Sequence, residues 1–264
     1  MIQLAGPKRR ISMWLGALTI WIVALLPVFA GASELADTVA RVKGSVVGIG
    51  THQPTGRPPS RLLGTGFVVG NGLQVITNAH VLPASLDTER FETLVVFIGS
   101  GESPTARPVE IRTVDRDHDV ALLGIKGQAL PALQLGDSER VREGELYAFT
   151  GFPIGAVLGL YPATHQGLIA SITPVAIPQV SLRGLDVNML RRLQDPYEVF
   201  QLDATAYPGS SGSPLYHPKT GRVVGVINKV FVQGTKESAL ERPSGITYAI
   251  PVRHVRQLLE VDSP

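Results

Sequence analysis

The residues best suited to chemistry lie in a glycine-rich turn at 203–215, which reads D-A-T-A-Y-P-G-S-S-G-S-P-L. Ser211 stands in this turn, directly before an apolar, strand-like run. A serine hydroxyl attacks a carbonyl carbon only when a base removes its proton and hydrogen-bond donors stabilise the resulting oxyanion. Gly209 lets the backbone turn so that its own N–H and that of Ser211 point at one spot. We therefore predict an oxyanion hole at Gly209, Ser210 and Ser211, although the turn alone also fits a Gly/Ser surface loop.

A candidate base lies upstream in residues 77–81 (T-N-A-H-V), at the exit of a predicted hairpin. The hairpin is expected at residues 67–76, because two apolar runs flank the turn-forming residues 70–72 (G-N-G). An imidazole gains and loses a proton near neutral pH, so His80 can take the Ser211 proton and return it to the leaving amine. A lone histidine after a strand also fits a structural role, so this prediction depends on its partners.

The candidate acid comes from residues 112–119, which contain three aspartates. The carboxylate of such a set must be partly buried to orient the imidazole and stabilise its charged form. Asp119 directly precedes the apolar run V-A-L-L and so enters the edge of the core. Asp115 and Asp117 are flanked by polar residues and are expected to be solvated, and His118 is expected at the surface. Asp119 is the predicted acid, with Asp117 as the alternative.

The order His80, Asp119, Ser211 is that of chymotrypsin-type enzymes and differs from the orders in α/β-hydrolases and subtilisins. T-N-A-H-V, D-V-A-L-L, P-G-S-S-G-S-P-L and the late I-T-Y-A-I-P segment, in this order over residues 45–259, resemble the HtrA/Deg family of serine endopeptidases. The resemblance implies an all-β fold of two six-stranded Greek-key barrels of the chymotrypsin type, with a short helix at each end. It also implies hydrolysis of unfolded or damaged polypeptides through an acyl-enzyme. An α/β-hydrolase esterase disagrees with the residue order and with the missing βα alternation.

The nucleophile turn departs from the family pattern. The family's usual G-N-S-G-G reads G-S-S-G-S at residues 209–213, and Ser213 adds a Cβ that would strain the oxyanion loop. The alternative function is therefore a catalytically silent relative that binds peptides or a partner protein. The chain order of His80, Asp119 and Ser211 favours the active enzyme.

Substrate binding is predicted from two further segments. Thr205 takes the place implied for the floor of the primary specificity pocket, and its lack of charge favours small or aliphatic residues before the cleaved bond over Lys or Arg. The opposite wall is expected from Ile227, Asn228, Lys229 and Val230, whose extended backbone can pair with a peptide strand.

Residues 1–32 have the pattern of a secretory signal. Three basic residues at 8–10 precede an apolar run at 11–29, and A-G-A at 30–32 offers small residues for cleavage. We expect a periplasmic or secreted protein, with membrane attachment through residues 11–30 as the alternative. Without this segment the net charge falls from +2 to −1, so net charge gives no argument for nucleic-acid binding.

The remainder divides into a predicted N-terminal barrel at 33–142 and a C-terminal barrel at 143–264. A helix at 33–42 is expected to pack across the first barrel, with a contact in an assembly as the alternative. A second helix is expected after Pro251. Residues 174–196 and 235–245 are expected to form loops beside the site. The chain stops at Pro264, so a protease domain without a PDZ domain is expected, and the resemblance implies a homotrimer as one oligomeric state. The absence of cysteine and the scattered histidines predict neither a metal nor a cofactor.

Overall fold

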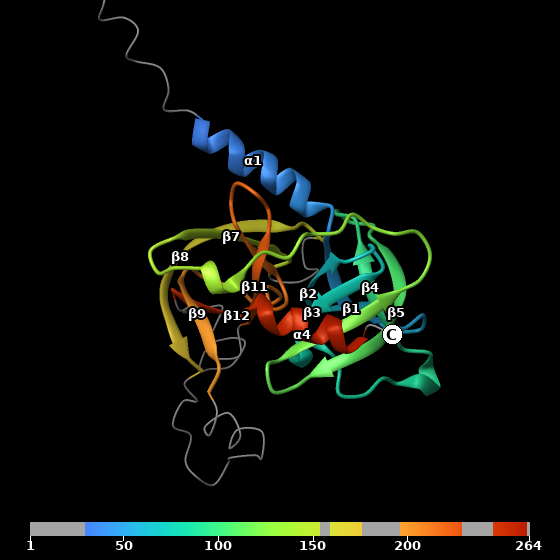
Figure 1. Ribbon diagram of the computed structural model, residues 1–264. Helices are drawn as coiled ribbons and strands as arrows, with labels where there is room; N and C mark the ends of the chain where they lie inside the picture. The colour runs from blue at the N-terminus through green and yellow to red at the C-terminus, as the bar shows by residue number, and fades with distance from the viewer. Residues whose placement is uncertain (1–29, 154–158, 176–195, 229–244, 263–264) are drawn as a thin grey trace, which may run out of the picture.

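The computed structural model describes residues 30–153, 159–175, 196–228 and 245–262 (Figure 1). Within these residues the chain forms two closed antiparallel barrels. The first closes in the order β1-β2-β3-β6-β5-β4 and the second in the order β10-β11-β12-β9-β8-β7. With an N-terminal and a C-terminal helix, this is the chymotrypsin fold, and the all-β, two-barrel prediction is confirmed.

Each barrel takes six strands that follow one another in the sequence. The first barrel consists of β1 (Val46–His52), β2 (Ser60–Val69), β3 (Gln74–Thr77), β4 (Thr93–Ile98), β5 (Thr105–Asp115) and β6 (Val120–Ile125). The second consists of β7 (Leu146–Gly151), β8 (Ala163–Pro174), β9 (Glu198–Asp203), β10 (Pro214–Tyr216), β11 (Val223–Asn228) and β12 (Ile246–Pro251). The domain boundary expected after residue 142 falls in the stretch between β6 and β7.

Alternating side chains of these strands supply three apolar clusters, because neighbouring residues of a strand point to opposite faces. One cluster fills the first barrel and one the second. The third unites the two barrels, and its fully buried members include Phe67, Ile76, Leu122, Tyr216 and Val226. The β2–β3 hairpin contributes to this junction, since Phe67 pairs with Ile76. The two barrels are thus held together by a continuous core, and the site described below lies where they meet.

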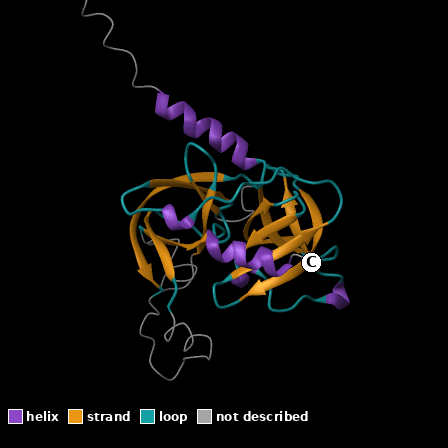
Figure 2. Ribbon diagram, in the orientation of Figure 1, coloured by secondary structure: helices purple, strands orange, loops and turns teal. Residues whose placement is uncertain are grey.

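The C-terminal helix α4 (Val252–Asp262) crosses both barrels (Figure 2). It packs on β5 and β6 of the first barrel and on β11 and β12 of the second. Val252, Val255 and Leu258 are its buried apolar residues. The helix therefore fixes the orientation of one barrel relative to the other.

The N-terminal helix α1 (Ala30–Lys43) lies on the second barrel, so the expected packing across the first barrel is wrong. The Thr38 hydroxyl donates to the carbonyl oxygen of Lys219 over 3.1 Å, and Lys219 pairs with Glu34 over 3.2 Å. An apolar helix face predicts that the face is buried, but it does not specify which neighbour buries it. No helix among the described residues has the length and apolar character needed to cross a membrane.

Candidate active site

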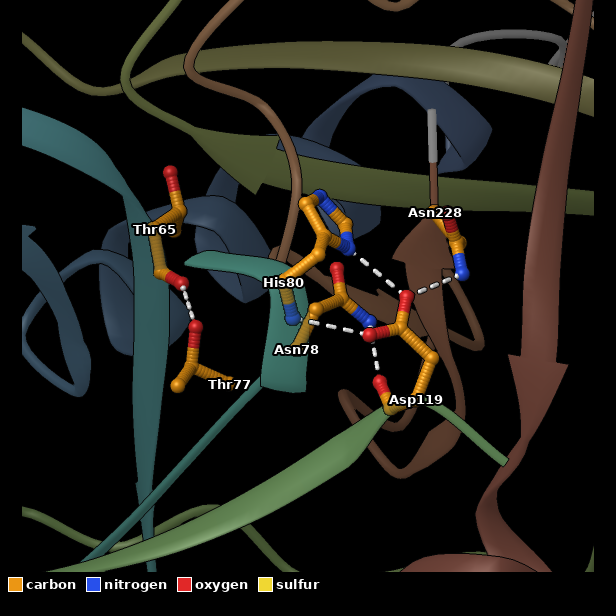
Figure 3. A network of polar contacts seen from close by, with 6 residues as sticks. All are labelled: Thr65, Thr77, Asn78, His80, Asp119 and Asn228. Atoms are coloured by element: carbon orange, nitrogen blue, oxygen red, sulfur yellow. Dashed lines mark hydrogen bonds and ion pairs between the residues drawn. The ribbon is translucent and has the colours of Figure 1, made fainter. Parts of the chain in front are cut away.

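Asp119 and His80 form the centre of the site (Figure 3). Asp119 lies in the turn between β5 and β6, and His80 lies in a single helical turn, Ala79–Val81, that follows β3. His80 Nδ1 lies 2.7 Å from Asp119 Oδ2, and the His80 backbone N–H donates to Asp119 Oδ1 over 2.9 Å. A carboxylate only accepts, so Nδ1 carries the proton and the Nε2 lone pair is available as a base. Asp119 is buried, whereas about a third of the His80 side chain is exposed.

The backbone of Asp119 is held in an unusual conformation. Its φ is +54°, in the left-handed region that non-glycine residues rarely adopt. Its carbonyl oxygen accepts from the Asn78 side-chain amide over 3.0 Å and from the Ala79 N–H over 3.2 Å. These two bonds tie the Asp119 turn to the segment that carries His80. The carboxylate and the imidazole are therefore fixed relative to each other by backbone as well as side-chain contacts.

The second barrel supplies a further donor to the same carboxylate. Asn228, at the end of β11, is buried, and its side-chain amide donates to Asp119 Oδ2 over 2.7 Å. Oδ2 is the oxygen that also accepts from His80 Nδ1. Asn228 was predicted in the substrate-binding wall, and residue types gave no signal for its contact with Asp119. The structure thus gives Asn228 a position behind the candidate acid.

Ser211 lies in the turn between β9 and β10, pressed against the first barrel. Its carbonyl oxygen accepts from the Thr65 N–H in β2 over 2.8 Å. The next residue, Gly212, has a φ of +88°, and a Cβ there would lie 2.0 Å from the Thr65 carbonyl oxygen. Only glycine fits this approach, since any side chain would meet the backbone of β2. The close contact brings Ser211 to the first barrel, where His80 and Asp119 lie.

The segments carrying His80 and Ser211 meet at Gly64. A Cβ at Gly64 would lie 2.8 Å from two methyl carbons of Val81, the neighbour of His80, and 3.0 Å from the Ser211 carbonyl oxygen. Among the described residues no hydrogen bond joins the His80 ring to the Ser211 hydroxyl. Bonds between a nucleophile and its base commonly tighten only when substrate is bound. His80, Asp119 and Ser211 thus lie on three segments that converge at the junction of the barrels.

The predicted oxyanion loop presents two backbone donors. The Ser210 N–H donates to the Tyr207 carbonyl oxygen over 3.0 Å. The N–H groups of Gly209 and Ser211 have no partner among the described residues. Gly209 has a φ of +97°, which glycine adopts without strain. These two donors flank a fixed peptide and are available to an oxyanion.

Ser213 fits into the loop because it faces a glycine. A Cβ at Gly151 would lie 1.9 Å from Ser213 Oγ, so the Ser213 side chain occupies the space that any larger residue at 151 would need. Ser213 is fully buried, and its hydroxyl has no hydrogen-bond partner among the described residues. The room beside Gly151 accommodates the extra Cβ that the sequence led us to expect as a source of strain.

The predicted substrate-binding residues lie in two places. Thr205 is half-buried in the segment between β9 and Ser211. The Ile227 side chain is buried in the core of the second barrel, and its backbone bonds the nucleophile turn through Gly212 and Ser213. Lys229 and Val230 lie outside the described residues, as do residues 176–195 and most of the loop expected at 235–245. The roles of Thr205 and of this strand in substrate binding stay predictions.

A second histidine–aspartate pair lies in the turn that leads to Asp119 and was not expected. His118 Nδ1 lies 2.6 Å from Asp115 Oδ2, and the His118 ring stacks on His254 of α4 with centroids 3.9 Å apart. Asp115 and His118 are thus partly exposed and less solvated than expected, because α4 packs against the His118 ring, whereas Asp117 is exposed. Burial alone would raise the pKa of Asp115, but the hydrogen bonds from His118 outweigh it and lower that pKa.

Burial also governs His254. It lowers the pKa of His254 to about 4, and the neighbouring His118 and Arg253 add to the effect. The Tyr197 ring packs edge-on against both imidazoles, with centroids 4.8 and 5.2 Å away. His118 directly precedes Asp119 in the chain, so this cluster anchors α4 and Tyr197 next to the turn that carries the candidate acid.

The two barrels and the convergence at their junction define a chymotrypsin-type protein, and comparison with known proteins agrees. The trypsin-like peptidase domain family matches residues 64–226, and the chain belongs to this family. It is similar to the mitochondrial serine protease HTRA2 of Drosophila pseudoobscura pseudoobscura, with 31% identity over 233 residues that cover 86% of this chain and 46% of the relative. HTRA2 of Drosophila willistoni is 31% identical over 207 residues, which cover 78% of this chain and 40% of the relative. The chain thus spans about half the length of the curated relatives it matches.

Solved structures of HtrA-type proteases share the fold. AlgW with a tripeptide superposes with a TM-score of 0.61 and 23% identity, covering 86% of this chain and 62% of that one. AlgW with a decapeptide gives a TM-score of 0.62 and 21% identity, covering 86% and 67% of the two chains. At these identities the likeness shows the fold alone. The family resemblance drawn from the motifs is confirmed.

Proposed function

We propose that this chain is a serine endopeptidase in which Ser211 is the nucleophile, His80 the general base and acid, and Asp119 the group that orients His80. The observation that carries the proposal is the contact between His80 Nδ1 and the buried Asp119 carboxylate, 2.7 Å long. It directs Nε2 away from the acid, and the nucleophile turn is bonded to the same barrel. The oxyanion of the tetrahedral intermediate would accept from the N–H groups of Gly209 and Ser211.

The proposed reaction follows from these positions. His80 takes the Ser211 proton as the hydroxyl oxygen attacks the peptide carbonyl carbon, and it then gives that proton to the leaving amine. Water hydrolyses the acyl-enzyme with His80 again as base. The buried Asp119 carboxylate stabilises the imidazolium formed in both steps.

The substrates we propose are unfolded or damaged polypeptides with a small or aliphatic residue before the cleaved bond. Support comes from the uncharged Thr205 in the segment that leads to Ser211. Cleavage mapping on a peptide library would test activity and preference together. Cleavage mainly after Lys or Arg would contradict the proposed preference.

A fluorophosphonate probe tests the chemistry most directly, since it reacts with an activated serine. The wild-type chain is expected to take up the probe and to cleave casein, whereas Ser211→Ala and His80→Ala are expected to do neither. A folded wild-type protein that takes up no probe would favour the catalytically silent, peptide-binding alternative. Support for that alternative comes from Ser213. At this position the turn departs from the family pattern, and the buried hydroxyl has no hydrogen-bond partner among the described residues.

We also propose that the protein is exported. The basic, apolar and small-residue pattern of residues 1–32 supports this location. N-terminal sequencing of the exported protein is expected to start near residue 33. An intact N-terminus in the membrane fraction would instead indicate an anchor at residues 11–30.

Assembly as a homotrimer is a further proposal and is supported only by the resemblance to HtrA/Deg proteins. Light scattering on the purified protein would distinguish a single 28.2 kDa chain from an assembly of three. A monomer at working concentration would contradict it.

A further inference from the structure

Every polar group of Thr65, in β2, forms a hydrogen bond. Its backbone N–H donates to the Ser211 carbonyl oxygen over 2.8 Å, and its own carbonyl oxygen accepts from the Thr77 hydroxyl over 2.7 Å (Figure 3). Its hydroxyl donates to the Gly209 carbonyl oxygen over 2.7 Å and accepts from the Phe152 N–H over 3.0 Å. The residue is fully buried. Thr65 therefore connects the nucleophile turn, the strand leading to His80 and the second barrel.

The bond to Gly209 acts on one particular peptide unit. The peptide between Gly209 and Ser210 is held at its oxygen by the Thr65 hydroxyl and at its nitrogen by the Tyr207 carbonyl oxygen. The N–H groups on either side of this unit, those of Gly209 and Ser211, are the two donors without a partner among the described residues. The two donors belong to the adjacent peptide units, so holding this peptide restrains the backbone rotations that direct them.

We propose that Thr65 is a positioning residue, whose hydroxyl orients the backbone donors of the oxyanion hole. This inference rests on the proposed peptidase function. Glycine leaves the backbone at position 209 conformationally free, so a contact from outside the loop restrains its φ at +97°. The hydroxyl supplies that contact from the barrel that carries His80. It thereby fixes the oxyanion donors relative to the base without touching the substrate.

The Thr65 hydroxyl both donates and accepts a hydrogen bond, so substitutions at Thr65 can remove or keep both bonds. Valine has nearly the shape of threonine but neither donates to Gly209 nor accepts from Phe152. Serine keeps the hydroxyl and loses only a methyl group. Both variants keep the backbone bond to Ser211, so the position of the nucleophile itself is retained.

The test compares rates of fluorophosphonate reaction at Ser211, measured well below each variant's melting temperature. Thr65→Val is expected to react about 10- to 100-fold more slowly, a smaller loss than removal of an oxyanion donor outright. Thr65→Ser is expected to stay within about threefold of wild type, because it restores the hydrogen bond. With a peptide substrate the loss is expected in kcat and not in KM, since the oxyanion exists only after attack.

Thr38→Val is the matched control. Thr38 is also fully buried, and its hydroxyl likewise donates to a carbonyl oxygen, that of Lys219, and accepts from Arg41. It lies on α1, outside the site, so its loss is expected to lower the melting temperature and leave the reaction rate unchanged. An equal rate loss in Thr38→Val and Thr65→Val would reduce Thr65 to a merely stabilising residue and overturn the proposal.

Hydrogen exchange at the Ser210 amide gives a readout independent of activity. Thr65→Val is expected to speed this exchange at least tenfold over wild type, while Thr65→Ser keeps the slow rate. Unchanged exchange would overturn the inference even if the wild-type chain took up no probe and the peptidase function failed. Thr65→Ala, which adds no new methyl group, serves for both measurements if the valine variant does not fold.

Discussion

The side-chain amide of Asn228 and the carboxylate of Asp119 lie 2.7 Å apart across the junction of the two barrels. Asn228 ends a strand of the second barrel, and Asp119 lies in a turn of the first. Oδ2 of Asp119 accepts hydrogen bonds from both Asn228 and His80. The position of this one oxygen therefore determines how the candidate acid and base are oriented. Formation of the site therefore depends on the docking of the barrels.

This contact predicts that Asn228 affects catalysis through Asp119. A hydrogen bond to a charged group is worth about 1.5–3 kcal/mol, so Asn228→Ala is expected to lower kcat by about 10- to 100-fold. The matched control is Asn71→Ala, since the Asn71 side chain bonds only the exposed β2–β3 turn. Steady-state kinetics on a peptide substrate gives the answer. A kcat equal to that of wild type would show that Asn228 does not contribute to catalysis.

Asp119 and Asp117 are distinguished by a pair of matched substitutions. Asp119→Asn keeps the shape but no longer favours the imidazole tautomer with a proton on Nδ1, and kcat is expected to fall about 10³- to 10⁴-fold. Asp117 is exposed, and Asp117→Asn is expected to leave kcat within about twofold of wild type. A large loss in the Asp117 variant alone would transfer the role of acid to that residue.

Gly151 and Ser213 are predicted to be coupled in stability. Gly151→Ala would place a Cβ 1.9 Å from Ser213 Oγ and is expected to cost about 3 kcal/mol of unfolding free energy. Adding Ser213→Gly removes the side chain it meets and is expected to recover about half of that loss. Urea unfolding of the two single variants and the double variant measures the coupling. Simple additivity of the two effects would show that these residues do not share the space.

His254 predicts a stability that depends on pH. Its pKa is about 4 in the folded chain and near 6.5 when exposed, so between these values the unfolded chain binds more protons. The free energy of unfolding is therefore expected to fall by about 1–3 kcal/mol as the pH drops from 6.5 to 4, and this contribution is constant above pH 6.5. His118, Asp115 and Arg253 face the ring and are retained in the test.

His254→Phe keeps an aromatic ring against His118 but cannot take up a proton. This variant is expected to lose less stability than wild type over the same pH range, as followed by chemical unfolding at each pH. Parallel curves for the two proteins would show that His254 does not carry the dependence.

The sequence by itself determined much of the fold and which residues are the candidates for the chemistry. Alternating apolar residues around residues 70–72 predicted the β2–β3 hairpin, and the spacing of Val252, Val255 and Leu258 predicted α4. These are local patterns, in which neighbouring residues specify strand or helix. Ser211 was the candidate nucleophile because it stands in a glycine-rich turn before a strand and follows a histidine and an aspartate in this order.

Only the tertiary structure decided how these residues are held. Asn228 bonds Asp119 across 109 residues of chain, and Thr65 bonds Gly209 across 144. His118 was expected at the surface, and the stacking of its ring on His254 was not foreseen, because nothing near residue 118 in the sequence indicates where the C-terminal helix will dock. Such contacts depend on how two closed barrels meet, and the spacing of residues along a strand carries no information about the partner barrel. Residue types and local periodicity therefore predicted the chemistry, whereas the positions of the groups that support it came from the packing of the barrels and α4.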